Sequence, residues 1–161
     1  ATVRDNDLTD LGEAGILVQD GAQALVTANA ITNTRTWGIA VTGAESSGTI
    51  SRNEIRAAGL AGIGVSHAAN ATVLQNDLPA SDTHGILVEG EGTSAAVWQN
   101  TIGPAPAGIA VTNGAVASVS RNQVAQDIDT GLMVDDAQVT ATGNIFAGSA
   151  AEPAATPVPA A

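Results

Sequence analysis

The sequence contains no cysteine and few aromatic residues. The absence of cysteine excludes a disulfide framework, thiolate metal sites and cysteine nucleophiles. Among 161 residues there are two Trp, one Phe and no Tyr, although hydrophobic residues make up 44% of the chain. The hydrophobic core must therefore be built from Val, Ile, Leu and Ala.

Positive charge is also scarce. Sixteen acidic residues against five arginines and no lysine give a net charge of −11. Nucleic-acid binding depends on Lys and Arg contacts with phosphate, so we expect no nucleic-acid partner. No apolar run approaches the ~20 residues of a membrane-spanning helix, so no membrane span is expected either. The first segment, ATVRDNDLTD, is charged and lacks the apolar stretch of a signal peptide, which leaves the mature part of an exported precursor as an option.

An internal repeat of about 23 residues organises the chain. A Gly-Ile/Leu-x-Val tetrapeptide recurs at this interval, and its glycines are Gly15, Gly38, Gly62, Gly85, Gly108 and Gly131. A second element, Val-x-x-Asn-x-Ile, recurs with the same period, and its asparagines are Asn6, Asn29, Asn53, Asn76, Asn100, Asn122 and Asn144. Because these two independent series of motifs share one period, the repeat is established.

Apolar residues alternate with a period of two within each repeat, which is typical of strands and not of helices. In each tetrapeptide the Ile and the Val are predicted to point inward, as Ile39 and Val41 illustrate. The second element supplies another strand, and a shorter third side, such as TNTRTW, returns the chain to the next glycine. One unit cannot bury its apolar face, but stacked units share a continuous core. Six to seven coils at ~4.8 Å each predict a rod of roughly 30 Å.

These two elements resemble the right-handed parallel β-helix superfamily, which includes pectate lyase-like enzymes and short-coil periplasmic and surface proteins. The predicted fold is therefore an all-β, right-handed parallel β-helix of about six to seven coils. The resemblance runs from Ala1 to Phe146. A leucine-rich repeat fits less well because Leu is scarce and no helical segment is present, and a left-handed hexapeptide helix requires a period divisible by six.

The predicted domain covers residues 1–147, and the Ala/Pro-rich segment 148–161 is predicted to be a linker or tail. Because the chain starts part-way through a repeat, we expect a piece of a larger protein or a unit that stacks end to end. The asparagines are interpreted as structural, forming side-chain hydrogen-bonded ladders and tolerating left-handed backbone at turns. The leading glycines are interpreted as tight corners that need positive φ.

Candidate catalytic residues are few. Asp82 and His84 are weak candidates on the variable third side, where a carboxylate near a histidine can form an acid/base pair; a solvated turn is the favoured interpretation. Asp127 and Asp129 are weak candidates for calcium, which β-helix lyases hold with carboxylates. No other cofactor is expected. The chain lacks the Gly-His-Gly and paired aspartates of the polygalacturonase branch, so we lean against an enzyme.

Equivalent residues of successive repeats form columns along the predicted solenoid, and the columns that face outward suggest a contact surface. Leu17, Leu87 and Met133 belong to a weakly apolar stripe, and Leu74 and Trp98 form a second exposed apolar pair. Ordinary strand-surface residues are the alternative interpretation. A column running from Gln19 to Asp135 carries charges that spoil an ice-binding face.

We therefore expect a non-catalytic structural or adhesive module of an exported, periplasmic or cell-surface protein. Its expected partner is another protein chain or a second copy, bound through the faces or ends of the β-helix, with a polysaccharide as a further option. The alternative is a carbohydrate-active or glycan-binding domain that uses Asp82, His84, Asp127 and Asp129. A third option, an accessory protein for copper-enzyme maturation, has few ligands available, with no Cys, one Met and two His.

Overall fold

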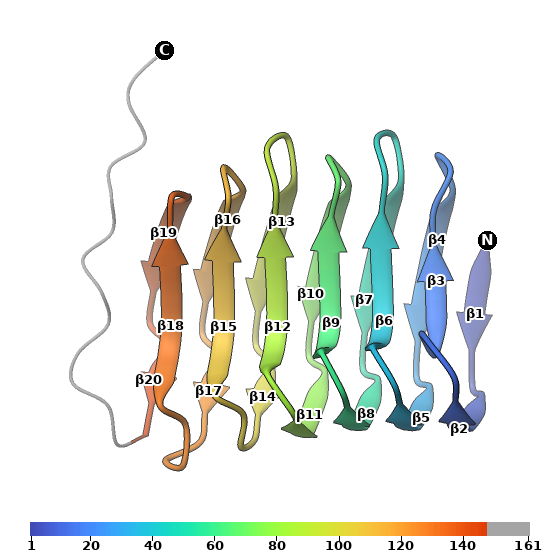
Figure 1. Cartoon of the computed structure of the whole chain (residues 1–161), viewed down its shortest axis with the longest axis horizontal. Coiled ribbons are helices and arrows are strands. Elements are labelled where there is room, and N and C mark those ends of the chain that lie inside the picture. Colours follow the sequence, from blue (N-terminus) through green and yellow to red (C-terminus); the bar gives the residue numbers. More distant parts are fainter. Residues whose placement is uncertain (148–161) are drawn as a thin grey trace.

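The computed structural model describes residues 1–147, which form a parallel β-solenoid with three flat sides (Figure 1). Each complete coil contributes one strand to each of three sheets, here named A, B and C. The predicted tail, 148–161, lies outside the described residues. No helix occurs among the described residues, so none is long and apolar enough to span a membrane.

Sheets A and B each contain seven strands. Sheet A consists of β1 (Thr2–Arg4), β4 (Gln23–Thr27), β7 (Ser47–Ser51), β10 (Asn70–Leu74), β13 (Ser94–Trp98), β16 (Val116–Ser120) and β19 (Gln138–Thr142). Sheet B consists of β2 (Asp7–Leu11), β5 (Ala30–Thr34), β8 (Glu54–Ala58), β11 (Asp77–Ser81), β14 (Thr101–Ile102), β17 (Gln123–Val124) and β20 (Ile145–Phe146).

Sheet C contains the glycine-led tetrapeptides. Its six strands are β3 (Ile16–Val18), β6 (Trp37–Thr42), β9 (Ala61–Ser66), β12 (His84–Glu89), β15 (Ala107–Thr112) and β18 (Thr130–Asp135). In Figure 1 this sheet lies in front, and sheet A lies behind it. Every pairing is parallel and, apart from register shifts between β8 and β11, joins equivalent residues of successive coils, for example Ile39 with Ile63 and Val41 with Val65. The predicted fold class is therefore confirmed.

The predicted inward residues form one continuous core along the solenoid axis. Val26, Ile50, Val73, Val97 and Val119 in sheet A have no exposed surface. The Ile and Val of the tetrapeptides are equally buried in the middle coils. Val134 differs, with 38% of its surface exposed, because β18 is the terminal strand of sheet C in the described structure. Stacking of equivalent apolar residues thus supplies the burial that a single coil lacks.

The second repeat element is split at its asparagine. The Val belongs to sheet A and the Ile to sheet B, so Val26 and Ile31 lie on different sides of a corner at Asn29. The asparagine itself does not adopt positive φ: the residue before it does, as Ala28 at 56° and Arg52 at 54° show. From Asn6 to Asn122, each asparagine side chain donates to its copy in the next coil, so the predicted ladder is confirmed while its predicted backbone conformation is wrong.

The leading glycines are needed for space and not for positive φ, which none of them adopts. A Cβ on Gly38 would lie 2.5 Å from the carbonyl oxygen of Gly62 and 2.3 Å from Cγ2 of Ile55. Gly85 is equally crowded by Ile102 and Gly108. The predicted conformational reason for these glycines is therefore wrong, and close approach of successive coils replaces it.

Candidate functional site

The outer face of sheet C carries a hydrophobic cluster separate from the interior core. Ala61, Leu87 and Ala110 are its buried members, and Trp37 and Met133 pack against them. Strand register explains the cluster, because Gly64, Leu87, Ala110 and Met133 are equivalent residues of successive coils. We call this group, with Leu17 and Gly64 of the same column, the sheet C cluster.

Trp37 reaches across the sheet to the next strand. A Cβ on Gly64 would lie 2.1 Å from Cζ3 and 2.2 Å from Cε3 of the indole ring. The indole therefore packs directly on the backbone at Gly64, and only glycine leaves room for it. Trp37 is half-buried as a result, and its ring forms part of the outer surface.

Exposure along this column differs from the prediction. Leu17 is 49% exposed, as expected for an outward residue, and Met133 is half-buried. Leu87 is only 5% exposed, because its side chain packs with Ala61 and Ala110 on the outer face of the sheet. The predicted exposed stripe is thus wrong at Leu87, although that residue does face outward. Whether these residues bind anything stays a prediction.

Leu74 and Trp98 are brought side by side on sheet A. They are register partners at the ends of β10 and β13, and both are half-buried. They belong to a different side of the solenoid from the sheet C cluster. The structure therefore separates the predicted binding residues into two surfaces.

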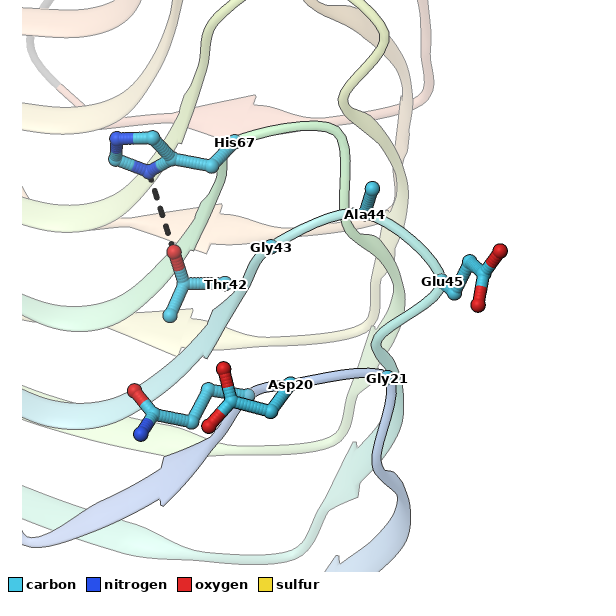
Figure 2. Close-up of a pocket in the computed structure, with 8 residues that line it drawn as sticks. Asp20, Gly21, Thr42, Gly43, Ala44, Glu45 and His67 are labelled. Atoms are coloured by element: carbon cyan, nitrogen blue, oxygen red, sulfur yellow. Dashed lines mark hydrogen bonds between the residues drawn. The ribbon is translucent and has the colours of Figure 1, made fainter.

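A polar pocket of about 480 Å³ lies at the edge where sheet C turns into sheet A (Figure 2). Residues of three successive coils line it, among them Gln19, Asp20, Thr42, Glu45 and His67. Figure 2 shows the side chain of Glu45 pointing away from Asp20, Thr42 and His67. A second cavity, of about 370 Å³, continues along the same edge and shares His67 with the first.

His67 is held in place by two hydroxyl groups. Its Nδ1 lies 2.9 Å from Oγ of Ser66 and 3.1 Å from Oγ1 of Thr42, and Ser66 Oγ donates to Thr42 Oγ1 at 3.1 Å. No role was predicted for His67 from the sequence. The repeat period was the available signal, since it places Thr42 and Ser66 at equivalent positions of neighbouring coils.

The predicted catalytic residues share one corner of the solenoid but not one coil. Asp82 lies between β11 and β12, where sheet B turns into sheet C, and His84 is the first residue of β12. Asp127 and Asp129 occupy the same corner two coils later. The two coils are separated by about 10 Å at the usual strand spacing. His67 and His84 lie at opposite edges of sheet C, so the two histidines are not brought together.

The corner that contains Asp82 and His84 shows few interactions that would support catalysis or metal binding. Nδ1 of His84 is shielded from solvent and has no hydrogen-bond partner in the structure. Within residues 1–147, no three His, Asp or Glu side chains converge closely enough to hold a metal ion. The catalytic role of Asp82 and His84 and the calcium role of Asp127 and Asp129 stay predictions.

The three-sided parallel coil with an internal asparagine ladder defines a class of β-solenoid. A family model described as a right-handed beta helix region matches residues 1–102, which is more than half of the chain. The chain therefore belongs to the right-handed β-helix family, as its repeats predicted. Comparisons with curated proteins and with solved structures find no match.

Proposed function

We propose that this chain is a non-catalytic binding module of an exported or cell-surface protein, and that it binds another protein chain through the outer face of sheet C. The sheet C cluster is the observation that supports this proposal. Trp37 and Met133, both half-buried, pack against the buried Leu87 and Ala110 on the outer face of the sheet. Leu17, 49% exposed, lies in the same column, so Leu17, Trp37 and Met133 supply the accessible apolar surface. Apolar groups gathered on an outer surface commonly mark a contact site.

The partner best supported is a second copy of this chain. The outward column through the middle of sheet C, which runs from Leu17 to Met133, contains no Asp, Glu or Arg, in a chain whose net charge is −11. Two such faces can meet without bringing carboxylates together at their centre. Six strands of up to six residues give a face of about 20 by 25 Å on each copy. Two such faces together would bury about 1,000 Å², which is the lower limit for a specific interface.

Charge favours this lateral contact over stacking of the solenoid ends. The first described coil carries Asp5, Asp7, Asp10 and Glu13, and the last complete coil carries a second acidic group, Asp127, Asp129, Asp135 and Asp136. Like charges at both ends oppose head-to-tail contact, as charged edge strands do in other sheets.

Sedimentation velocity over a wide range of protein concentrations tests the proposal. The wild type is expected to dimerise, and a Leu17→Asp/Met133→Asp double variant is expected to remain monomeric because it places carboxylates on the face. Val116→Asp is the matched control, since Val116 is 41% exposed but lies on sheet A. A wild type that stays monomeric at every concentration contradicts the dimer.

A carbohydrate-active enzyme is the second candidate, supported by the shared corner of Asp82, His84, Asp127 and Asp129. Its test is a depolymerisation screen with acidic and neutral glycans, with and without calcium, that scores new reducing ends and unsaturated products. Calcium-dependent turnover that is lost in Asp82→Ala/His84→Ala would replace the non-catalytic proposal. No turnover is expected.

A further inference from the structure

The outer face of sheet A has a composition unlike the rest of the molecule. Its seven strands contain a single charged residue, Arg4, although the sequence has 21 charged residues. The outward residues are mainly Ser, Thr, Asn and Gln, with Leu74 and Trp98 among them. One complete outward column consists of Thr2, Leu25, Thr49, Thr72, Ala96, Ser118 and Thr140.

This face is also regular. All six strand pairs of sheet A keep an unbroken register, whereas the pairing of β8 with β11 in sheet B is interrupted by register shifts. Equivalent side chains are therefore spaced at about 4.8 Å along the solenoid and at about 6.7 Å along each strand. A regular array of hydroxyl and amide groups matches a ligand whose own polar groups repeat.

Trp98 supplies an aromatic surface within this polar array. It is half-buried and lies between Leu74 and Ser120 in its column. Ser51 lies beyond Leu74, and Arg4, Thr27 and Thr142 complete the column. The indole ring offers a large apolar face with little conformational entropy to lose. A ligand with C–H groups that pack on the indole ring and hydroxyls that hydrogen-bond to the neighbouring side chains matches both the apolar and the polar parts of this surface.

A depression lies on the same face. It has a volume of about 440 Å³ and is lined by residues of three neighbouring strands, including Gln23, Ser47, Thr49, Asn70 and Thr72. Asn70 donates from Nδ2 to Oγ of Ser94 on the next strand, which orients its amide. The depression therefore continues the row of polar groups toward Trp98, two strands away from Ser47.

We propose that the outer face of sheet A binds an uncharged polysaccharide, with Trp98 stacking on a sugar ring and the Ser, Thr and Asn side chains hydrogen-bonding to its hydroxyls. Polyanions are disfavoured by the net charge of −11, and polycations find no carboxylate in the strands of this face. A strictly planar crystalline surface such as ice fits less well, because Leu74 and Trp98 project among the small hydroxyl side chains. The proposal is independent of the dimer, which uses sheet C.

Tryptophan fluorescence isolates this site because the chain has only two tryptophans, one on each face. In Trp37→Phe, emission reports Trp98 alone, and titration with soluble neutral β-glucan is expected to shift it. In Trp98→Phe, emission reports Trp37 and is expected not to change. A response from Trp37 without one from Trp98 would overturn the assignment to sheet A, whichever way the dimer test ends.

Co-sedimentation with insoluble cellulose and β-1,3-glucan measures binding directly. We expect Trp98→Ala to weaken retention about tenfold while Trp37→Ala retains wild-type binding. Thr72→Glu is a second variant that adds charge to the same face and is expected to weaken binding without removing an aromatic ring. Because the ligand is uncharged, added salt is expected to leave retention unchanged.

Three results would overturn the proposal: no retention of the wild type on any neutral polysaccharide, unchanged retention of both face variants, or inhibition of ice recrystallisation in place of glycan binding. Circular dichroism and thermal unfolding establish that each variant is folded. An effect on retention with unchanged unfolding supports a surface role.

Discussion

Asn53 accepts two hydrogen bonds from Asn29 of the preceding coil, one from the backbone nitrogen at 3.0 Å and one from Nδ2 at 2.9 Å. The same pair of bonds joins Asn53 to Asn76 and Asn76 to Asn100. Each side chain therefore satisfies a backbone donor and an amide donor inside the solenoid, where an unsatisfied polar group is costly. The ladder stabilises the corner between sheets A and B in every coil.

Replacement of Asn53 by Ala is expected to lower the free energy of unfolding by about 3 kcal/mol, because it removes the acceptor of the buried Asn29 backbone N–H and the side-chain bond to the Val26 carbonyl. Nδ2 of Asn29 loses one bond and keeps those to Val3 and Thr27. Denaturant unfolding measures the change. Asn6→Ala is the matched control at the exposed start of the ladder, and its loss is expected to be about 1 kcal/mol or less. Equal losses at the two positions would contradict a ladder held by burial.

Gly38→Ala is expected to destabilise the protein by about 3 kcal/mol, since its Cβ would lie 2.5 Å from the Gly62 carbonyl oxygen and must separate the coils. Gly12→Ala provides the control because no heavy atom lies within 4 Å of the added carbon. Its unfolding free energy is expected to change by less than about 1 kcal/mol. Thermal unfolding of both variants provides the comparison, and similar melting temperatures would refute the steric explanation.

Gly64→Ala is expected to displace Trp37 from the outer face of sheet C, because the new methyl group would overlap the indole ring. The ring can move outward into solvent, so emission is expected to shift to longer wavelength and quenching by acrylamide to increase. The experiment uses a Trp98→Phe background so that Trp37 is the only fluorophore. Unchanged emission would show that the ring does not pack on Gly64.

Ile63→Ala is expected to cost about 3 kcal/mol because Ile63 has no exposed surface and the cavity cannot close between two stacked coils. Leu17→Ala, at a residue 49% exposed, is expected to change stability by less than about 0.5 kcal/mol. Urea unfolding of the two variants tests this difference. A loss at Leu17 comparable to that at Ile63 would place Leu17 in the core and contradict its exposed position.

The candidate binding surfaces were only partly predictable. Leu74 and Trp98 were identified as an apolar pair from their equivalent positions in the repeat, and the structure pairs them. The polar array around them was missed because the outward residues of sheet A vary from coil to coil and form no sequence motif. His67 was missed for a related reason: its contact with Thr42 joins residues 25 positions apart.

The sequence by itself determined the repeat, the parallel three-sided coil and the inward residues, because each coil is a copy of the last and equivalent positions must stack. Exposure was decided only by the tertiary structure. Leu87 faces outward yet is buried, since Ala61 and Ala110 come against it from strands about 23 residues away on either side. The leading glycines likewise reflect the close approach of neighbouring coils, a distance that no single repeat contains. Periodicity specifies which residues share a column, whereas packing between columns specifies which of them are exposed to solvent.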